Sequence, residues 1–248
     1  MSGHSKWSSI KRKKGANDAK RGQIFTKIAR EITVAARAGG SNRDENSSLR
    51  LAVAKARQAN MPRDNIDRAI ERATSAADAD TFDEVRYEGY GPGGVAILIQ
   101  TLTDNRNRTV GEVRSTLSKA GGNMGDAGSV AWNFSQRGLI TIDVEGDQDP
   151  DEVALEAIEA GADDVAVDSS LIEVFTVPRD ADKVRQALVD SGVNVSAAEV
   201  VWHPGTTIEV DEEKALSLLK LIDSLEDLDD VQAVATNADF PDSVFAEA

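Results

Sequence analysis

The fold is decided between residues 138 and 203, which read GLITIDVEGDQDPDEVALEAIEAGADDVAVDSSLIEVFTVPRDADKVRQALVDSGVNVSAAEVVWH. Apolar runs of strand length alternate here with apolar residues at helical spacing. Asp149 and Pro150 suit the N-cap and first turn of one helix, and Gly161 and Gly192 suit the ends of two. We predict strand, helix, strand, strand, helix and strand at residues 138–144, 149–161, 165–168, 171–177, 180–191 and 198–203, with a turn at 169–170. This order is that of a ferredoxin-like domain.

A second set of strands and helices flanks this stretch on both sides. Upstream, a turn at Gly91–Gly94 precedes a buried-strand pattern, and Thr109 with Glu112 forms a capping box that opens a helix. The patterns predict strand, helix and strand at 95–99, 109–120 and 129–134, and again at 207–210, 211–225 and 231–236. We therefore expect a second, discontinuous ferredoxin-like domain, residues 81–134 with 205–248, into which residues 135–204 are inserted.

The first 80 residues follow a different pattern. Ile24, Ile28 and Ile32 recur at helical spacing before Gly39 and Gly40, and similar patterns mark helices at residues 49–59 and 62–73. We expect residues 1–80 to form a basic arm and a helical bundle. The predicted fold class is multidomain, α and α+β, with this bundle and two ferredoxin-like α+β domains, one inserted in the other.

Charge is distributed very unevenly along the chain. The whole sequence of 248 residues has a formal charge of −15, which by itself argues against a polyphosphate partner. Residues 1–72, however, hold 17 Lys and Arg against 7 Asp and Glu, a net of +10, and the remainder has a net of −25. Such asymmetry is typical of proteins that contact nucleic acid or a membrane surface with one segment.

The basic arm and first helix supply the candidate contact residues. Lysine and arginine neutralise phosphates without needing a fixed base geometry. Trp7 is interpreted either as a stacking partner for an unpaired base or as a residue buried against the bundle. The alternative for the whole segment is a solvated charged face. The predicted nucleic-acid contacts are Lys6, Trp7, Lys11, Arg12, Lys13, Lys14, Lys20, Arg21, Lys27 and Arg30.

Two further segments invite a ligand interpretation. Arg106 and Arg108 lie between a predicted strand and a predicted helix, where the helix dipole favours an anion. We predict nucleic-acid contacts for both, with a capped loop and two solvated arginines as the alternative. Residues 121–128 would extend this second surface toward nucleic acid, a ribosome or a protein. Gly91–Gly94 precedes a strand and is interpreted as a structural turn rather than a phosphate loop.

Catalytic patterns are missing from the sequence. It contains no cysteine and two histidines, His4 and His203, so that no metal cluster or Ser/His pair is indicated. The acidic residues between Asp223 and Asp230 lack the spacing of a calcium loop and are expected to form solvated surface. We predict a non-enzymatic protein without cofactor or metal, located in the cytoplasm because no apolar run suits a signal peptide or membrane span.

Several long motifs resemble the YebC/PmpR family of probable transcriptional regulatory proteins, and they occur in the same order from end to end. They are GHSKW (3–7), YEGYGPGG (87–94), LTDNRNRT (102–109), GGNMG (121–125), GSVAW (128–132) and DDVQ (229–232). The resemblance implies a helical N-terminal domain and two α+β domains, one inserted in the other. It also implies DNA-binding regulation, while a related mitochondrial translational activator indicates a role at the ribosome.

The combined prediction is a regulator that binds DNA through its basic N-terminal domain. The first alternative is a ribosome-associated translation factor that assists elongation at difficult sequences and binds ribosomal RNA with the same arm. The second is a protein-interaction scaffold that uses the acidic domains. No recognition helix and no dimerising heptad can be identified, which favours contact with the phosphate backbone. Oligomeric state and target sequence are left open by the sequence.

Overall fold

The computed structural model describes residues 18–74, 82–144, 149–168, 171–241 and 243–246. Their contacts divide them into two units. Unit 1 holds the described residues of 80–135 and 202–248 together with 18–23, and unit 2 holds those of 24–79 and 136–201. None of the helices in these ranges is long and apolar enough to cross a membrane.

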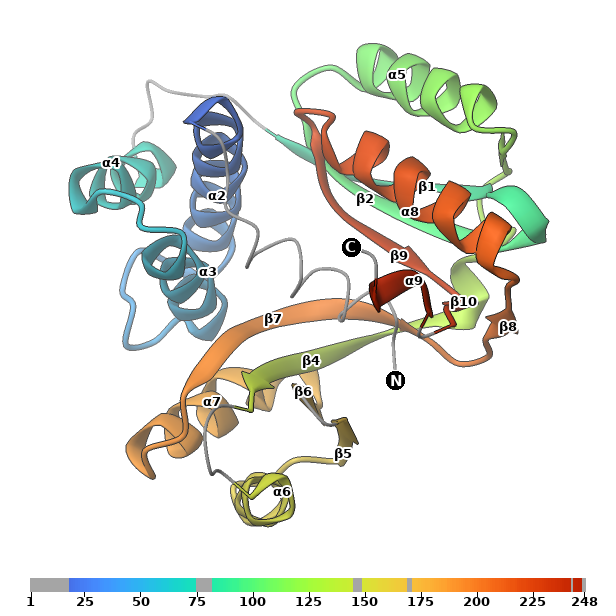
Figure 1. Cartoon of the computed structure of the whole chain (residues 1–248). Helices are drawn as coiled ribbons and strands as arrows, with labels where there is room; N and C mark the ends of the chain where they lie inside the picture. Colours follow the sequence, from blue (N-terminus) through green and yellow to red (C-terminus); the bar gives the residue numbers. More distant parts are fainter. Residues whose placement is uncertain (1–17, 75–81, 145–148, 169–170, 242, 247–248) are drawn as a thin grey trace. The chain divides into compact units, whose positions relative to one another are not determined.

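Unit 1 is built on an antiparallel sheet, here called sheet A, with the strand order β3-β1-β2-β9. Helices α5 and α8 lie together over one face of it (Figure 1). Strand β2 is central and is buried along almost its whole length. The elements are β1 (Asp83–Tyr90), β2 (Ala96–Thr103), α5 (Arg106–Lys119), β3 (Asn123–Met124), α8 (Glu212–Glu226) and β9 (Val231–Thr236).

The two faces of sheet A carry separate cores because side chains alternate along β2. Ile97 and Ile99 pack with α5 and α8, whereas Ala96 and Leu98 pack with Phe134 on the opposite face. Short elements complete the unit: η1 (Pro92–Gly94), η2 (Ala131–Asn133), the parallel pair β8 (Ile208–Glu209) and β10 (Ala238–Asp239), and α9 (Ser243–Ala246).

Unit 2 contains a second four-stranded sheet, sheet B, with the strand order β5-β6-β4-β7. Helices α6 and α7 share an apolar core with Ile140, Ile142, Ile172 and Val174 on one face of this sheet. The elements are β4 (Phe134–Asp143), α6 (Pro150–Glu159), β5 (Asp164–Asp168), β6 (Leu171–Thr176), η3 (Pro178–Asp180), α7 (Ala181–Asp190) and β7 (Val195–Pro204).

Unit 2 also contains a three-helix bundle. Helices α2 (Asp18–Gly39), α3 (Ser47–Gln58) and α4 (Arg63–Thr74) bury an apolar stripe that includes Ile32, Leu49 and Ile66. Leu51, on another side of α3, belongs to the core of α6 and α7. The salt bridge from Arg50 Nε to Asp182 Oδ2, 2.5 Å long, links α3 to α7 in the same region.

The predicted mixed α and α+β class is confirmed, as are the strands and helices predicted between residues 138 and 203. The predicted turn at Ser169 and Ser170 lies outside the described residues. The three predicted N-terminal helices are also present. The division into three domains, one inserted in another, stays a prediction.

Two predictions for unit 1 are wrong, and one strand was not predicted. Residues 129–133 do not form a strand, and β4 begins only at Phe134, because the backbone N–H groups of Val130 and Ala131 bind the Glu88 carboxylate instead of a neighbouring strand. The segment 207–210 adds no strand to sheet A; its Ile208 and Glu209 pair with β10. Strand β1 was missed because its charged residues, Glu84, Arg86 and Glu88 among them, interrupt the apolar pattern.

The predicted capping box at Thr109 is wrong as well. Helix α5 begins one turn earlier, and the side chain of Asn105 accepts the N-cap hydrogen bond from Arg108 N at 3.1 Å. Thr109 is buried inside the helix. An asparagine side chain caps as effectively as threonine, and here it is the first of the two along the chain.

Asn46 provides a test of the bundle. Its side chain accepts from Leu49 N at 3.0 Å and donates to the carbonyls of Ala35 and Gly40, both at 2.8 Å. We expect Asn46→Ala to lower the free energy of unfolding by about 1–2 kcal/mol, since it removes a cap and two hydrogen bonds to partly buried carbonyls. Urea denaturation measures this; exposed Ser48→Ala is the control, and equal loss in both variants would contradict the role of Asn46.

Candidate nucleic-acid interface

The predicted arm contacts are largely outside the part of the chain that the structure describes. This holds for Lys6, Trp7, Lys11, Arg12, Lys13 and Lys14, and for the side chain of Lys20. Arg21 is exposed on α2, whereas Lys27 and Arg30 are half-buried. All three already take part in an interaction within the chain. Their predicted contacts with nucleic acid stay predictions.

Several cations of the bundle are held by carboxylates. Arg43 binds Asp67 at 2.7 Å, and Arg50 binds the buried Asp182. Lys55 lies 2.9 Å from Glu31 and 3.7 Å from Glu199. Burial lowers the pKa of Lys55, but the two carboxylates outweigh it and hold this pKa above its ordinary value. These cations therefore form ion pairs within the protein.

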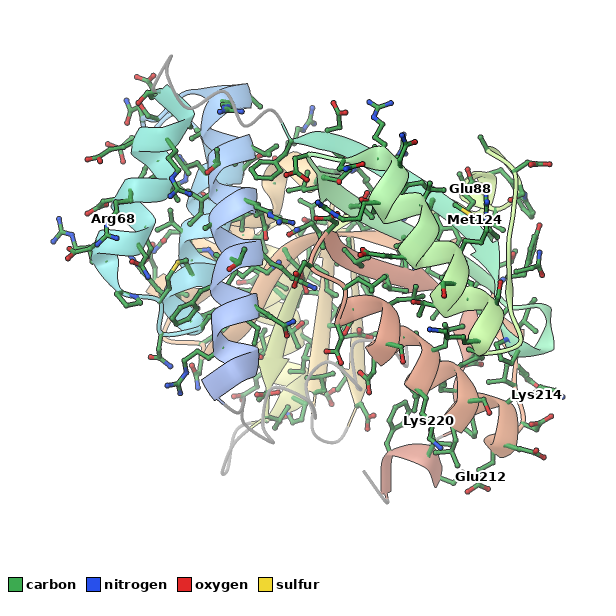
Figure 2. The ribbon with its side chains drawn as sticks, turned by 90° about the horizontal axis from the view of Figure 1, so that it is seen from above. Arg68, Glu88, Met124, Glu212, Lys214 and Lys220 are labelled. Carbon is green, nitrogen blue, oxygen red and sulfur yellow. The ribbon has the colours of Figure 1, made fainter. Side chains whose placement is uncertain are left out.

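A second group of bundle cations has no such partner. The guanidinium groups of Arg57, Arg68 and Arg72 are exposed and make no hydrogen bond or ion pair with another described residue. Arg68 and Arg72 are four residues apart and so share one face of α4. Figure 2 shows Arg68 on the side of α4 that points away from α2. These three arginines are free to bind an external anion.

Sequence reasoning missed Arg57, Arg68 and Arg72, although a signal for two of them was present. The apolar residues Ile66 and Ile70 fix the buried face of α4. Arg68 and Arg72 lie out of phase with them and must therefore face solvent. Which bundle arginines lack a carboxylate partner follows only from the tertiary contacts.

Arg106 and Arg108, the second predicted anion site, are both paired. Arg106 Nε lies 2.8 Å from Asp83 Oδ2. Arg108 Nη2 lies 2.8 Å from Asp104 Oδ1 and 2.6 Å from Asp230 Oδ2. Hydrogen bonds from these partners raise the pKa of each guanidinium above its ordinary value. A phosphate would have to displace a carboxylate, so the geometry does not favour this prediction, which stays untested.

Asp230 is not part of a solvated acidic surface as predicted. It is only 1% exposed, and its carboxylate accepts hydrogen bonds from Thr103 Oγ1 at 3.1 Å and Thr109 Oγ1 at 2.7 Å, in addition to the Arg108 bond. Donors from β2 and α5 thus converge on a residue at the start of β9. The motif LTDNRNRT stabilises the junction of these elements.

The glycine-rich segment 121–131 is fixed by a second buried carboxylate. Glu88, on β1, accepts from the backbone N–H groups of Gly128 at 2.7 Å, Val130 at 2.7 Å and Ala131 at 2.8 Å. Gly125 N donates to the Glu88 carbonyl at 2.8 Å. Glu88 and Met124 mark this region in Figure 2. The predicted contact surface at 121–128 is therefore a rigid loop, and its partner stays a prediction.

Glu88 is charged at neutral pH in spite of its burial. Burial alone raises its pKa, but three backbone donors and the nearby Arg86 outweigh this and lower the pKa below its ordinary value. A carboxylate with a lowered pKa stabilises the fold above the pKa of the unfolded chain, about 4.3. That stabilisation is lost as the pH falls through the pKa of the folded state.

We expect Glu88→Gln to lower the free energy of unfolding by about 2 kcal/mol at pH 7, because an amide nitrogen would face a backbone N–H. The difference from the wild type should shrink as the pH falls below about 4, where Glu88 is protonated. Urea denaturation across pH measures both effects. Exposed Glu84→Gln on the same strand should change stability by less than about 0.5 kcal/mol. If the loss of stability in Glu88→Gln did not change with pH, the Glu88 carboxylate would not be what holds the segment 128–131.

The surface depression in unit 1 does not gather side chains typical of a catalytic or metal site. A shallow depression of about 370 Å³ in unit 1 is lined by Pro92, Gly121, Asp211 and Lys214 among others. Lys214, labelled in Figure 2, is paired with Asp211, the N-cap of α8. Within the described ranges, no group of three or more His, Asp or Glu side chains is placed to hold a metal ion.

Known protein families cover nearly the whole chain. Residues 5–76 match the model described as the TACO1/YebC protein N-terminal domain, and residues 82–238 match the TACO1/YebC second and third domain. The chain belongs to the TACO1/YebC family. The resemblance predicted from the sequence motifs is thereby confirmed.

Close relatives of this TACO1/YebC chain are full-length matches. A protein of Chloroflexus aurantiacus is 56% identical over 241 residues, 96% of each chain, and one of Moorella thermoacetica is 51% identical over 246 residues, 98% of each. Both are named "Probable transcriptional regulatory protein". The crystal structure of a conserved hypothetical protein from Aquifex aeolicus is 43% identical, with a TM-score of 0.83 over 90% of this chain and 92% of that one.

Proposed function

We propose that this TACO1/YebC chain is a non-enzymatic regulatory protein that binds nucleic acid through its basic N-terminal segment. The observation that carries the proposal is the set of exposed arginines, Arg57, Arg68 and Arg72, that no carboxylate of the described chain neutralises. They lie in the segment whose net charge is +10, while the remainder of the chain carries −25. Phosphates are attracted to the first and repelled by the second.

The mode of contact in this proposal is electrostatic. Guanidinium groups on one exposed helix face match a row of phosphates and release counterions from it. Phosphate contacts set orientation and carry no sequence information directly. The arm cations from Lys6 to Arg21 would add further phosphate contacts, as the sequence predicts.

DNA is the nucleic acid in this proposal. The curated relatives bear the name "Probable transcriptional regulatory protein", and regulation of transcription acts on DNA. The translation alternative predicted from the sequence requires binding to ribosomes in place of duplex DNA. Parallel measurements on ribosomes and on duplex DNA separate the two.

The double variant Arg68→Ala/Arg72→Ala tests the proposal. Filter binding to duplex DNA across a salt series gives the slope of log K against log salt. Loss of two phosphate contacts should reduce the magnitude of this slope by about 1.8 and weaken binding at low salt. The fold should be unaffected, because both side chains are exposed.

Arg114→Ala is the matched control. Arg114 is an exposed arginine on α5 of unit 1 and has no ion-pair partner among the described residues. Its substitution removes one positive charge, whereas the double variant removes two. We expect its slope to equal that of the wild type. Equal slopes for all three proteins would show that α4 is not the contact face and would overturn the proposal.

A further inference from the structure

Trp132 is an exposed indole on an otherwise fixed part of unit 1. It is 76% exposed, more than any other large apolar side chain in the described ranges. An exposed tryptophan is unfavourable in water and adds little to folding. Its surroundings, by contrast, are tightly hydrogen-bonded on both sides. Such a combination indicates a contact residue rather than a core residue.

The chain is fixed directly before and after Trp132. Ala131 N donates to the Glu88 carboxylate at 2.8 Å. The Asn133 side chain accepts from Thr206 N at 2.9 Å and from Thr206 Oγ1 at 2.8 Å, and it donates to the Thr206 carbonyl at 2.9 Å. Binding at Trp132 would therefore cost little loop-ordering entropy.

The indole itself is also oriented. Its Nε1–H donates to the Ser129 carbonyl at 3.0 Å, and the Tyr90 hydroxyl donates to the same oxygen at 3.1 Å. The one polar group of the ring is thus satisfied within the protein. What remains for a partner is the π-face of the ring.

We infer that Trp132 is a stacking platform for an unpaired nucleobase. This inference rests on the proposed function, that the chain binds nucleic acid, and adds a contact residue that belongs to unit 1. Every base has a π-face, and stacking on an aromatic side chain needs no hydrogen bond from the ring. Unpaired bases of DNA and of RNA share this chemistry.

The surroundings of Trp132 fit a base better than a protein. Although the chain after residue 72 has a net charge of −25, Asp126 is the only charged residue between 121 and 136, so that little of this negative charge lies in the loop itself. The neighbouring residues of this loop are mainly small or polar, whereas a protein-docking site usually presents a contiguous apolar patch.

The test compares three probes on the full chain: a blunt DNA duplex, the same duplex with an oligo(dT) extension, and the same duplex with an oligo(U) extension. We expect one or both extensions to tighten binding by the wild type. Trp132→Ala should weaken binding to the extended probe by about 5- to 150-fold and leave the blunt duplex unchanged. The DNA and RNA arms show which strand supplies the base.

Two variants serve as controls. Trp132→Phe keeps an aromatic ring and should retain most of the gain from the extension. Leu216→Ala removes an exposed apolar side chain from α8 and should change nothing. If Trp132→Ala binds extended and blunt probes as the wild type does, the stacking inference is wrong while the proposed function stands. If the wild type binds none of the probes, the proposed function itself fails.

Discussion

A carboxylate that leaves water must find hydrogen-bond donors, and this constraint fixes three junctions of the described chain. Glu88 accepts from three backbone N–H groups of the segment 128–131. Asp230 takes two threonine hydroxyls and the guanidinium of Arg108. Asp182 takes Arg50 and Arg185 and thereby joins the bundle to α7. Removing any of these donors leaves a buried charge uncompensated, which is far more costly than the loss of an exposed ion pair.

The same constraint divides the cations of this acidic protein into those paired with internal carboxylates and those that are not. Arginines that neutralise internal carboxylates, such as Arg50 and Arg108, could bind a phosphate only by giving up a carboxylate partner. Arg57, Arg68 and Arg72 remain, and they lie in the one segment of positive net charge. The net charge of −15 therefore does not describe the surface that an anionic ligand would meet. Counting basic residues in the sequence overestimates this surface, because it treats paired and unpaired cations alike.

Periodicity predicted the elements whose side chains face one core. Ile140 and Ile142 alternate on sheet B, and Ile28 and Ile32 recur on α2, so that the sequence alone locates these elements. Periodicity fails for β1, where the charged Glu88 is buried because backbone donors 40 to 43 residues further along the chain bind its carboxylate. It also fails to identify the partner of Arg50, which is 132 residues distant along the chain. The sequence marks Trp132 only as part of a family motif, because its exposure depends on the loop that Glu88 fixes. Long-range polar contacts carry no local sequence signal.

The central claim is that DNA contacts the basic N-terminal segment and not the acidic remainder of the chain. The most direct test is backbone hydrogen–deuterium exchange of the full chain with and without a blunt DNA duplex. Exchange reports opening of individual segments, so it maps the contact without any substitution. The account predicts slower exchange in α4 and around Arg57 when DNA is bound, with α5 and α8 of unit 1 unchanged. Slower exchange confined to α5 and α8, with α3 and α4 unaffected, would contradict it.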